Sequence, residues 1–315
     1  MAILLAYFSV VLIWATTPLA IQWSSDSLSF IAAASLRMSF ALALGLLINM
    51  LLRRKLFCSS QVWRTYAAGA ISVFPNMPVV YWSAQYIPSG LIAVIFAMSP
   101  FVTGLMTMVL LKQNPFSLRR VIALSVALLG LIIIFYNQFQ IHTHAVYGML
   151  GILFSCFLFS FSSVLVKKVD SQVDAFNQML GSLLFALPGL LLSWWLLDGF
   201  MPNLVSTKSW AAIGYLAILG SLLGITLFFY VLANMTATAV SMITFMTPII
   251  ALVLGALLAN ESLGWQVWVG AILVIMALLF YLDLSVNEIL VKALQRPAWT
   301  HNQLQQVKNT FHKLK

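Results

Sequence analysis

Long apolar stretches alternate with short polar segments along this chain. Each stretch has about 20 residues, the length that an α-helix needs to cross the hydrocarbon core of a bilayer. The pattern predicts ten membrane-spanning helices, at residues 2–22, 28–52, 64–84, 87–111, 119–137, 147–166, 174–197, 209–232, 237–259 and 265–283. The first stretch lacks a preceding Lys or Arg and a clear small-x-small cleavage site, so we expect a retained helix and not a signal peptide.

The composition fits the same fold class, an all-α integral membrane protein. The chain is 62% hydrophobic and only 7% charged, and a soluble domain cannot bury so much apolar surface. The two cysteines, Cys58 and Cys156, fall in a predicted loop and inside a predicted helix. They do not form a disulfide framework.

An internal repeat divides the membrane part into two halves. The phrase Met-Ser-Pro at 98–100 recurs as Met-Thr-Pro at 246–248, and residues 63–135 align with 211–283 at a constant offset of 148. Five helices per half is an odd number, so the second half must enter the membrane from the opposite side. The repeat therefore predicts two inverted five-helix units.

This division gives three segments. We expect one repeat at 1–138, a second at 139–284, and a basic amphipathic tail at 285–315. Apolar residues recur at helical spacing in the tail with Lys and Arg between them, which is typical of a helix on an anionic membrane surface. A partly disordered, solubilising tail explains the same composition equally well.

The basic residues predict the orientation. With the N-terminus in the cytoplasm, Lys208 is the only basic residue in the outer loops, and Arg37 is the only one inside a span. The other 14 of the 16 lie on the inner side, as the positive-inside rule requires. We therefore expect a multi-pass protein of a bacterial-type inner membrane, with both termini cytoplasmic. The net charge of +9 is explained by topology, and we expect no nucleic-acid partner.

Two stretches carry a resemblance to a known family. YWSAQYIPSGLIAVIFAMSPFVTGLMTMVLL (81–111) resembles the junction of the third and fourth helices in EamA-type drug/metabolite transporters, and ANESLGWQVWVGAILVIMALL (259–279) resembles the turn before their last helix. Trp14 and Arg37 also stand where that family often has Trp and Arg. The resemblance covers about residues 1–283, with Gln113 in place of a usual Glu and Phe159 in place of a common Trp.

The resemblance implies ten helices, alternating access, and export or exchange of small metabolites. It does not identify the solute, because members of one fold handle chemically varied cargo. It also draws attention to Glu261, which occupies the Glu position of that turn. A carboxylate near a helix start is stabilised by the helix dipole, so Glu261 is either a cap or a gate contact.

Arg37 is the outstanding residue inside a predicted span. It lies about ten residues into the second span, and an Arg at mid-helix costs about 2.5–3.5 kcal/mol on insertion scales. We therefore expect it to face the bundle interior. One interpretation is that it attracts a substrate carboxylate or phosphate. The other is that it bonds carbonyls at helix ends and fixes helix packing.

Prolines break the predicted helices at corresponding places. Pro75 and Pro78 lie in the third span, and Pro100 and Pro248 lie in the two copies of the repeated phrase. Each proline removes an intrahelical hydrogen bond and frees a carbonyl. Broken helices at matched points of two repeats indicate a transporter's binding site, although prolines are also simply tolerated in membrane helices.

Polar and aromatic residues on neighbouring turns are candidates to line a central cavity. With Arg37, they are Trp14, Asn76, Tyr81, Trp82, Gln85, Ser99, Gln178, Thr226, Tyr230 and Thr247. The competing interpretation is that the aromatics pack and that Ser and Thr bond their own helix. The four histidines lack the spacing of a metal site, so we expect neither a metal nor a cofactor.

We therefore expect a secondary transporter that exports a small metabolite, an amino acid or a related anionic or zwitterionic solute, by alternating access. The alternatives are a membrane-embedded enzyme and a non-transporting membrane assembly protein. No G-x-S-x-G, H-E-x-x-H or Walker A motif is present in the sequence, which argues against an enzyme and against ATP-driven transport by this chain alone. Its expected partners are a small-molecule substrate and the lipid bilayer, and a homodimer stays open.

Overall fold

The computed structural model describes residues 2–56, 62–87, 92, 95–135, 145–169, 173–200, 204–250 and 265–281, and every regular element within these ranges is a helix. In chain order, the elements are α1 (Ala2–Ser24), α2 (Phe30–Leu51), α3 (Val62–Ala70), α4 (Asn76–Ser83), α6 (Ser99–Leu111), α7 (Leu118–Phe135), α8 (Ala145–Val169), α9 (Ala175–Leu197), α10 (Thr207–Tyr215), the π-helix η2 (Leu216–Leu223), α11 (Gly224–Asn234), α12 (Ala237–Ser241) and α14 (Trp265–Tyr281).

Five of these helices are long and apolar enough to cross a membrane. They are α1, α2, α8, α9 and the continuous helix Thr207–Asn234, which joins α10, η2 and α11. Shorter apolar helices cover Ser99–Leu111, Ala237–Ile250 and Trp268–Ala277. Every predicted span contains at least one helix within the described residues. The membrane-protein class is confirmed, while ten crossings in two inverted repeats stay a prediction.

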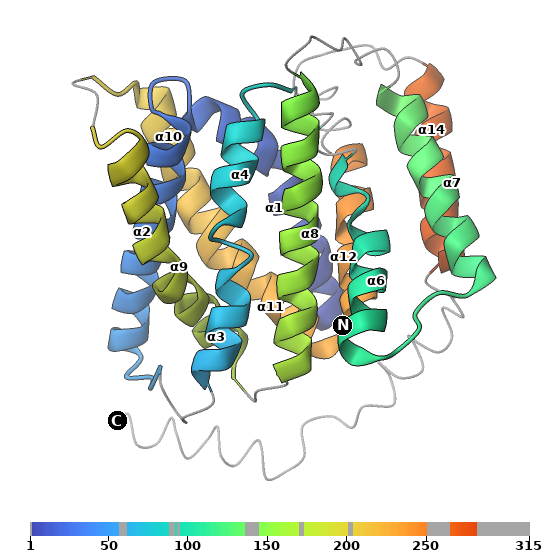
Figure 1. The fold of residues 1–315 in the computed structure, drawn as a ribbon, viewed down its shortest axis with the longest axis horizontal. Helices are drawn as coiled ribbons and strands as arrows, with labels where there is room; N and C mark the ends of the chain where they lie inside the picture. The colour runs from blue at the N-terminus through green and yellow to red at the C-terminus, as the bar shows by residue number, and fades with distance from the viewer. Residues whose placement is uncertain are drawn as a thin grey trace.

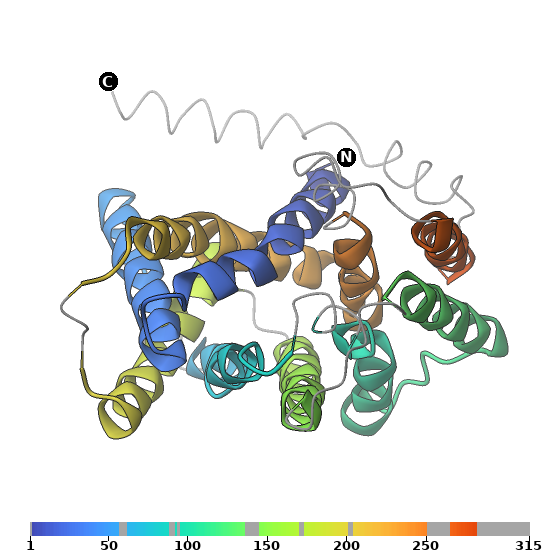
Figure 2. The ribbon, with the colours of Figure 1, turned by 90° about the horizontal axis from the view of Figure 1, so that it is seen from above.

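The helices stand side by side across the molecule. In Figures 1 and 2, α7 and α14 pair at one end, α2, α9 and α10 lie at the other, and α4 and α8 stand between them. The largest buried cluster draws on α1, α2, α3, α8, α9, α11 and α12. The centre of the molecule is therefore built by helices from both halves of the chain.

The third predicted span is broken, as its prolines suggested. Helix α3 ends at Ala70 and α4 begins at Asn76, with a turn between them. The side chain of Asn76 fills the gap, because its Nδ2 donates to the carbonyl oxygen of Ser72 at 2.9 Å. Pro75 and Pro78 stand at the start of α4, where a missing N–H costs little.

The two copies of the repeated Met-Ser-Pro and Met-Thr-Pro motif differ in their surroundings. Pro100 lies in the first turn of α6, whose N-cap is Met98, and a turn at residues 97 and 98 precedes it. Proline is favoured there because the first backbone N–H groups of a helix have no intrahelical partner. Pro248 is buried inside a helical stretch, and the interruption in that stretch falls earlier, at Met242.

The π-helix η2 was not predicted. It occupies the middle of the long helix Thr207–Asn234 and carries the buried residues Gly220 and Ser221. With the repeat offset of 148, its residues 216–223 correspond to 68–75, the region where α3 ends and the turn before α4 lies. Both halves therefore depart from regular α-helix at the same place, and π-turns within α-helices often mark functional sites.

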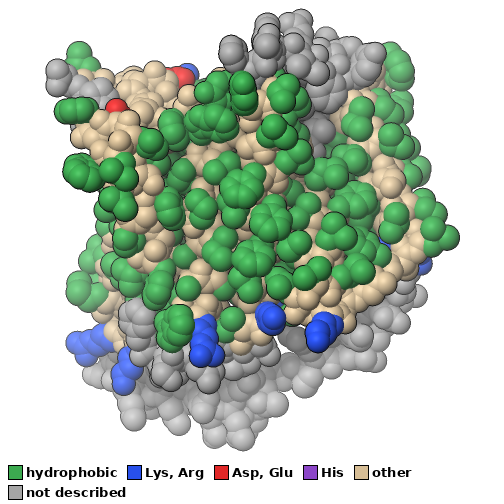
Figure 3. Space-filling view, in the orientation of Figure 1, with side chains coloured by type: hydrophobic (Ala, Val, Ile, Leu, Met, Phe, Trp, Pro, Cys, Tyr) green, Lys and Arg blue, Asp and Glu red, His purple; other side chains and the backbone are tan. Residues whose placement is uncertain are grey.

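Charged and apolar side chains separate on the surface. Figure 3 shows hydrophobic side chains over the middle of one face, with Lys and Arg gathered along one edge. Arg53 follows α2, Arg64 lies in the first turn of α3, and Lys112 and Lys168 lie at the ends of α6 and α8. Figure 1 places these four helix ends on one side of the molecule. This distribution suits a protein whose midsection faces lipid.

Candidate functional site

Arg37 lies in the interior of the helix assembly. Its residue is only 2% exposed, so the side chain faces away from lipid, as an intramembrane arginine must. Its Nε donates to Oγ of Ser221 at 2.8 Å, and its Nη1 donates to the hydroxyl of Tyr81 at 3.4 Å. Tyr81 belongs to α4 and Ser221 to η2. The guanidinium thus connects the first half of the chain with the second.

The partners of this cation are neutral and few. A guanidinium has five N–H donors, and Arg37 uses two of them on hydroxyl groups of the described residues. None of the acids that the structure describes, Asp26, Asp174 and Asp198, is buried. Gly220 gives the guanidinium room, because a Cβ there would lie 3.1 Å from Nη2. The arrangement is that of a buried positive charge with donors to spare, which can receive an anion.

Aromatic side chains from α1, α8 and α11 meet about one helical turn beyond the contact between Arg37 and Gly220. The ring of Trp14 in α1 stacks on the ring of Phe228, with 5.2 Å between their centroids. The ring of Phe159 packs edge-on against Trp14, with 5.9 Å between their centroids. The Nε1 of Trp14 lies 3.1 Å from the position of a Cβ on Gly224, about one helical turn beyond Gly220. Trp14 is only partly buried. The site therefore combines one cation with an aromatic surface.

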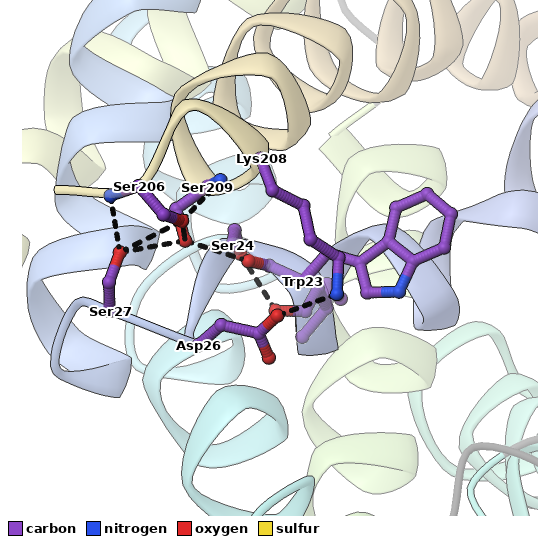
Figure 4. A network of polar contacts seen from close by, with 8 residues as sticks. Trp23, Ser24, Asp26, Ser27, Ser206, Lys208 and Ser209 are labelled. Carbon is purple, nitrogen blue, oxygen red and sulfur yellow. Dashed lines mark hydrogen bonds and ion pairs between the residues drawn. The ribbon is translucent and has the colours of Figure 1, made fainter.

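One end of the assembly is closed by a polar network, which Figure 4 shows from close by. Lys208 at the start of α10 forms an ion pair with Asp26 at 2.7 Å and lies 5.2 Å from the ring centroid of Trp23. Ser27 donates to Ser209 at 2.9 Å, and Ser209 donates to the carbonyl oxygen of Trp23 at 2.9 Å. This network, which we call the α10 clasp, joins the α1–α2 turn to the second half of the chain.

A smaller set of polar contacts, which we call the Arg54–Asp174 tie, joins the C-terminal end of α2 to the N-terminus of α9. Arg54, just beyond α2, lies 3.7 Å from Asp174, which caps the N-terminus of α9. The Nδ2 of Asn177 donates to the carbonyl oxygen of Lys55 at 3.2 Å. Helix α2 is therefore fastened to the second half at both of its ends and, through Arg37, in its middle.

Three predicted lining residues instead connect helices through satisfied hydrogen bonds. Asn76 accepts a bond from Ser155 of α8 at 2.5 Å, and Ser99 lies 3.2 Å from the sulfur of Cys156 on α8. Gln178 accepts from the hydroxyl of Thr65 and donates to its carbonyl oxygen, both at 2.8 Å. Because the polar atoms of Asn76 and Gln178 already form hydrogen bonds within the protein, these side chains have little remaining capacity to bind a solute.

The remaining candidates have varied surroundings. Thr226 bonds the carbonyl oxygen of Leu222 and Thr247 that of Thr244, both within their own helices. Trp82 packs edge-on against Tyr86 at 5.0 Å, and Tyr230 is partly buried. Gln85 is exposed, because α4 ends at Ser83 and the chain turns there, so the structure does not bring it to Arg37. Glu261 and the tail 285–315 lie outside the described residues.

Ser221 is the site residue that the sequence did not reveal. A serine in an apolar span usually bonds its own helix, and nothing near it in the chain indicates a charged partner 184 positions away. The repeat offers one signal, because residues 220 and 221 align with residues 72 and 73 in the break before Pro75. A distortion expected in both repeats would have drawn attention to it.

Comparison with known proteins identifies the protein family of this chain. The sequence model of the EamA-like transporter family matches residues 1–136 and 146–282, so the chain belongs to that family. It is a membrane transporter. It shares its fold with a solved crystal structure at a TM-score of 0.74 and 15% identity, over 91% of this chain and 98% of the other.

The chain is similar to several curated proteins, two of which are named as transporters. The uncharacterized inner membrane transporter YedA of Escherichia coli K12 is 24% identical over 277 residues, 86% of this chain and 88% of YedA. Protein PecM of Dickeya dadantii is 25% identical over 225 residues, 71% of this chain and 75% of PecM. The uncharacterized transporter YvbV of Bacillus subtilis is 25% identical over 223 residues, covering 68% of this chain and 70% of YvbV.

The two hydrogen bonds between Gln178 and Thr65 lead to a testable prediction. Gln178→Ala leaves the buried Thr65 hydroxyl without its partner, so we expect a loss of about 1–3 kcal/mol of stability and an unchanged KM for the transported solute. Thermal unfolding and transport kinetics of the purified variant measure both quantities. Gln85→Ala is the matched control, because this glutamine is exposed. A raised KM for Gln178→Ala at unchanged stability would contradict the purely structural role of Gln178 and place it in the solute site.

Proposed function

We propose that this protein is a secondary transporter that exports a small anionic or zwitterionic metabolite by alternating access, with Arg37 holding the anionic group of the cargo. The observation that carries the proposal is the buried Arg37 guanidinium, whose partners among the described residues are neutral and which bridges the two halves of the chain. An intramembrane charge is expensive and marks substrate pathways in transporters. On this proposal the protein is not an enzyme.

The proposed topology has ten crossings in two inverted repeats, at 1–138 and 139–284. The match of one family model to two successive segments supports this division, and so does the paired distortion of α3–α4 and η2. The helix ends with Arg53, Arg64, Lys112 and Lys168 face the cytoplasm in this proposal. The relative YedA, named as an inner membrane transporter, supports the same membrane for this chain.

The burial of Arg37 supports the proposed alternating access. At 2% exposure the residue cannot meet a solute until the surrounding helices part. The α10 clasp and the Arg54–Asp174 tie fasten opposite ends of α2 to the second half. In the proposed cycle one tie opens while the other holds, so the site faces one side of the membrane at a time.

Energy coupling is proposed to need no buried acid. The described acids Asp26, Asp174 and Asp198 stand at helix ends, whereas proton-driven transporters commonly use a buried group that changes charge. We propose downhill export or exchange, with proton coupling through a boundary acid as the second candidate.

Counterflow in proteoliposomes tests the proposed function. Vesicles loaded with single amino acids or organic acids should accumulate the labelled solute from outside when the protein is present. Arg37→Gln should lower this exchange at least about tenfold, since a hydrogen bond to a charged group contributes about 1.5–3 kcal/mol. Equal reconstituted amounts and equal melting temperatures control for folding. Unchanged kinetics in Arg37→Gln would exclude its role, and no exchange of any solute would contradict transport.

The α10 clasp generates a second test. Asp26→Asn removes an ion pair between half-exposed side chains, which contributes about 0–1 kcal/mol, so opening at this end should become up to about fivefold more frequent. A membrane-impermeant maleimide reports opening through Ser24→Cys, a buried position beside the clasp, in a background without the native cysteines. Lys168→Met, at the far end of α8, is the control. Equal labelling rates in all backgrounds would show that the clasp does not gate access.

A further inference from the structure

The donors left on Arg37 have the geometry of a carboxylate receptor. Both N–H groups of Nη2 and one of Nη1 remain unused among the described residues. Two parallel bonds from one guanidinium match the two oxygens of a carboxylate. Gly220 lets Nη2 pack closely against η2, because a Cβ on this residue would stand only 3.1 Å from that nitrogen and would push the guanidinium aside.

The charge balance at this place selects among anions. Arg37 is the only buried Lys or Arg in the part of the chain that the structure describes, so the site supplies one positive charge. A phosphate group of charge about −2 would leave one negative charge unbalanced. The ammonium of an amino acid would be unbalanced as well, because Asp26, Asp174 and Asp198 are not buried. A monocarboxylate cancels the charge of Arg37 and leaves none over.

The aromatic residues define the other end of the cargo. Trp14 borders Gly224, about one turn from Gly220 on the same helix, and its ring stacks with that of Phe228. Rings of this kind favour apolar and planar groups. A solute with its carboxylate at Gly220 would extend its body along this surface.

We propose that the cargo of this site is an amphipathic monocarboxylic acid without an ammonium group, whose carboxylate binds Arg37 over Gly220 and whose apolar, planar body contacts Trp14. This proposal rests on the proposed transport function and narrows its substrate class. It makes Gly220 a positioning residue, since any side chain there would displace the guanidinium that binds the carboxylate.

A matched ligand series tests the substrate class. The full-length protein in nanodiscs is titrated with 3-phenylpropionate, with phenylalanine, which adds only an ammonium, with 3-phenylpropanamide, which lacks the charge, and with propionate, which lacks the ring. Binding is measured by scintillation proximity of tritiated 3-phenylpropionate and by competition, with empty nanodiscs as blanks. The expected result is that 3-phenylpropionate binds at least about tenfold more tightly than each of the other three.

Variants locate the bound carboxylate. Gly220→Ala should weaken 3-phenylpropionate binding at least about tenfold, because the new methyl group lies 3.1 Å from Nη2 and displaces the guanidinium that holds the carboxylate. Gly214→Ala is the matched control on the same long helix, since a Cβ there meets nothing within 4 Å. Equal melting temperatures of the two variants show that Gly220→Ala acts locally. The ligand series with the unaltered protein needs no variant and remains decisive if Gly220→Ala fails to fold.

The outcomes separate this inference from the transport function. Phenylalanine binding as tightly as 3-phenylpropionate, or equal affinities in Gly220→Ala and Gly214→Ala, would overturn the inference. So would the absence of 3-phenylpropionate binding. A positive counterflow signal with another solute in any of these cases would leave the transport function standing. Absence of counterflow for every solute would instead count against the transport function.

Discussion

The need to accommodate one guanidinium inside an apolar bundle governs the centre of this structure. Arg37 cannot reach water or headgroups from the middle of α2, so its charge must be met by groups on neighbouring helices. Tyr81 and Ser221 supply these groups from opposite halves of the chain. The π-helix η2 carries Ser221 and Gly220 at the contact with α2. One side chain thus links α4 of the first half with the π-helix of the second.

The contacts at the two ends of α2 differ in kind from this central one. The ion pairs Asp26–Lys208 and Arg54–Asp174 are about half exposed, and exposed ion pairs contribute about 0–1 kcal/mol each. Contacts of that strength can break and re-form within a transport cycle. Breaking the buried contacts of Arg37 costs much more free energy than breaking the exposed ion pairs at the two ends of α2. This difference suits a protein that exposes one central site to the two sides of a membrane in turn.

Hydropathy predicted the positions of the helices because the bilayer demands about 20 apolar residues for each crossing. The burial of Arg37 also followed from the sequence, since the cost of exposing it to lipid is large. The sequence did not predict the π-helix or the hydrogen-bonded pair of Gln178 with Thr65. The two members of that pair are 113 positions apart in the chain, and hydrophobic periodicity does not encode such a contact.

On this proposal, the cargo's carboxylate supplies the counter-charge that Arg37 lacks among the described residues. A structure of the full-length protein with 3-(4-bromophenyl)propionate tests this directly, because anomalous scattering from bromine locates the ring independently of the carboxylate. We expect the carboxylate oxygens within hydrogen-bond distance of Nη1 and Nη2, and the bromine on the side of Trp14. A ligand bound elsewhere, with Arg37 still held only by Tyr81 and Ser221, would contradict it.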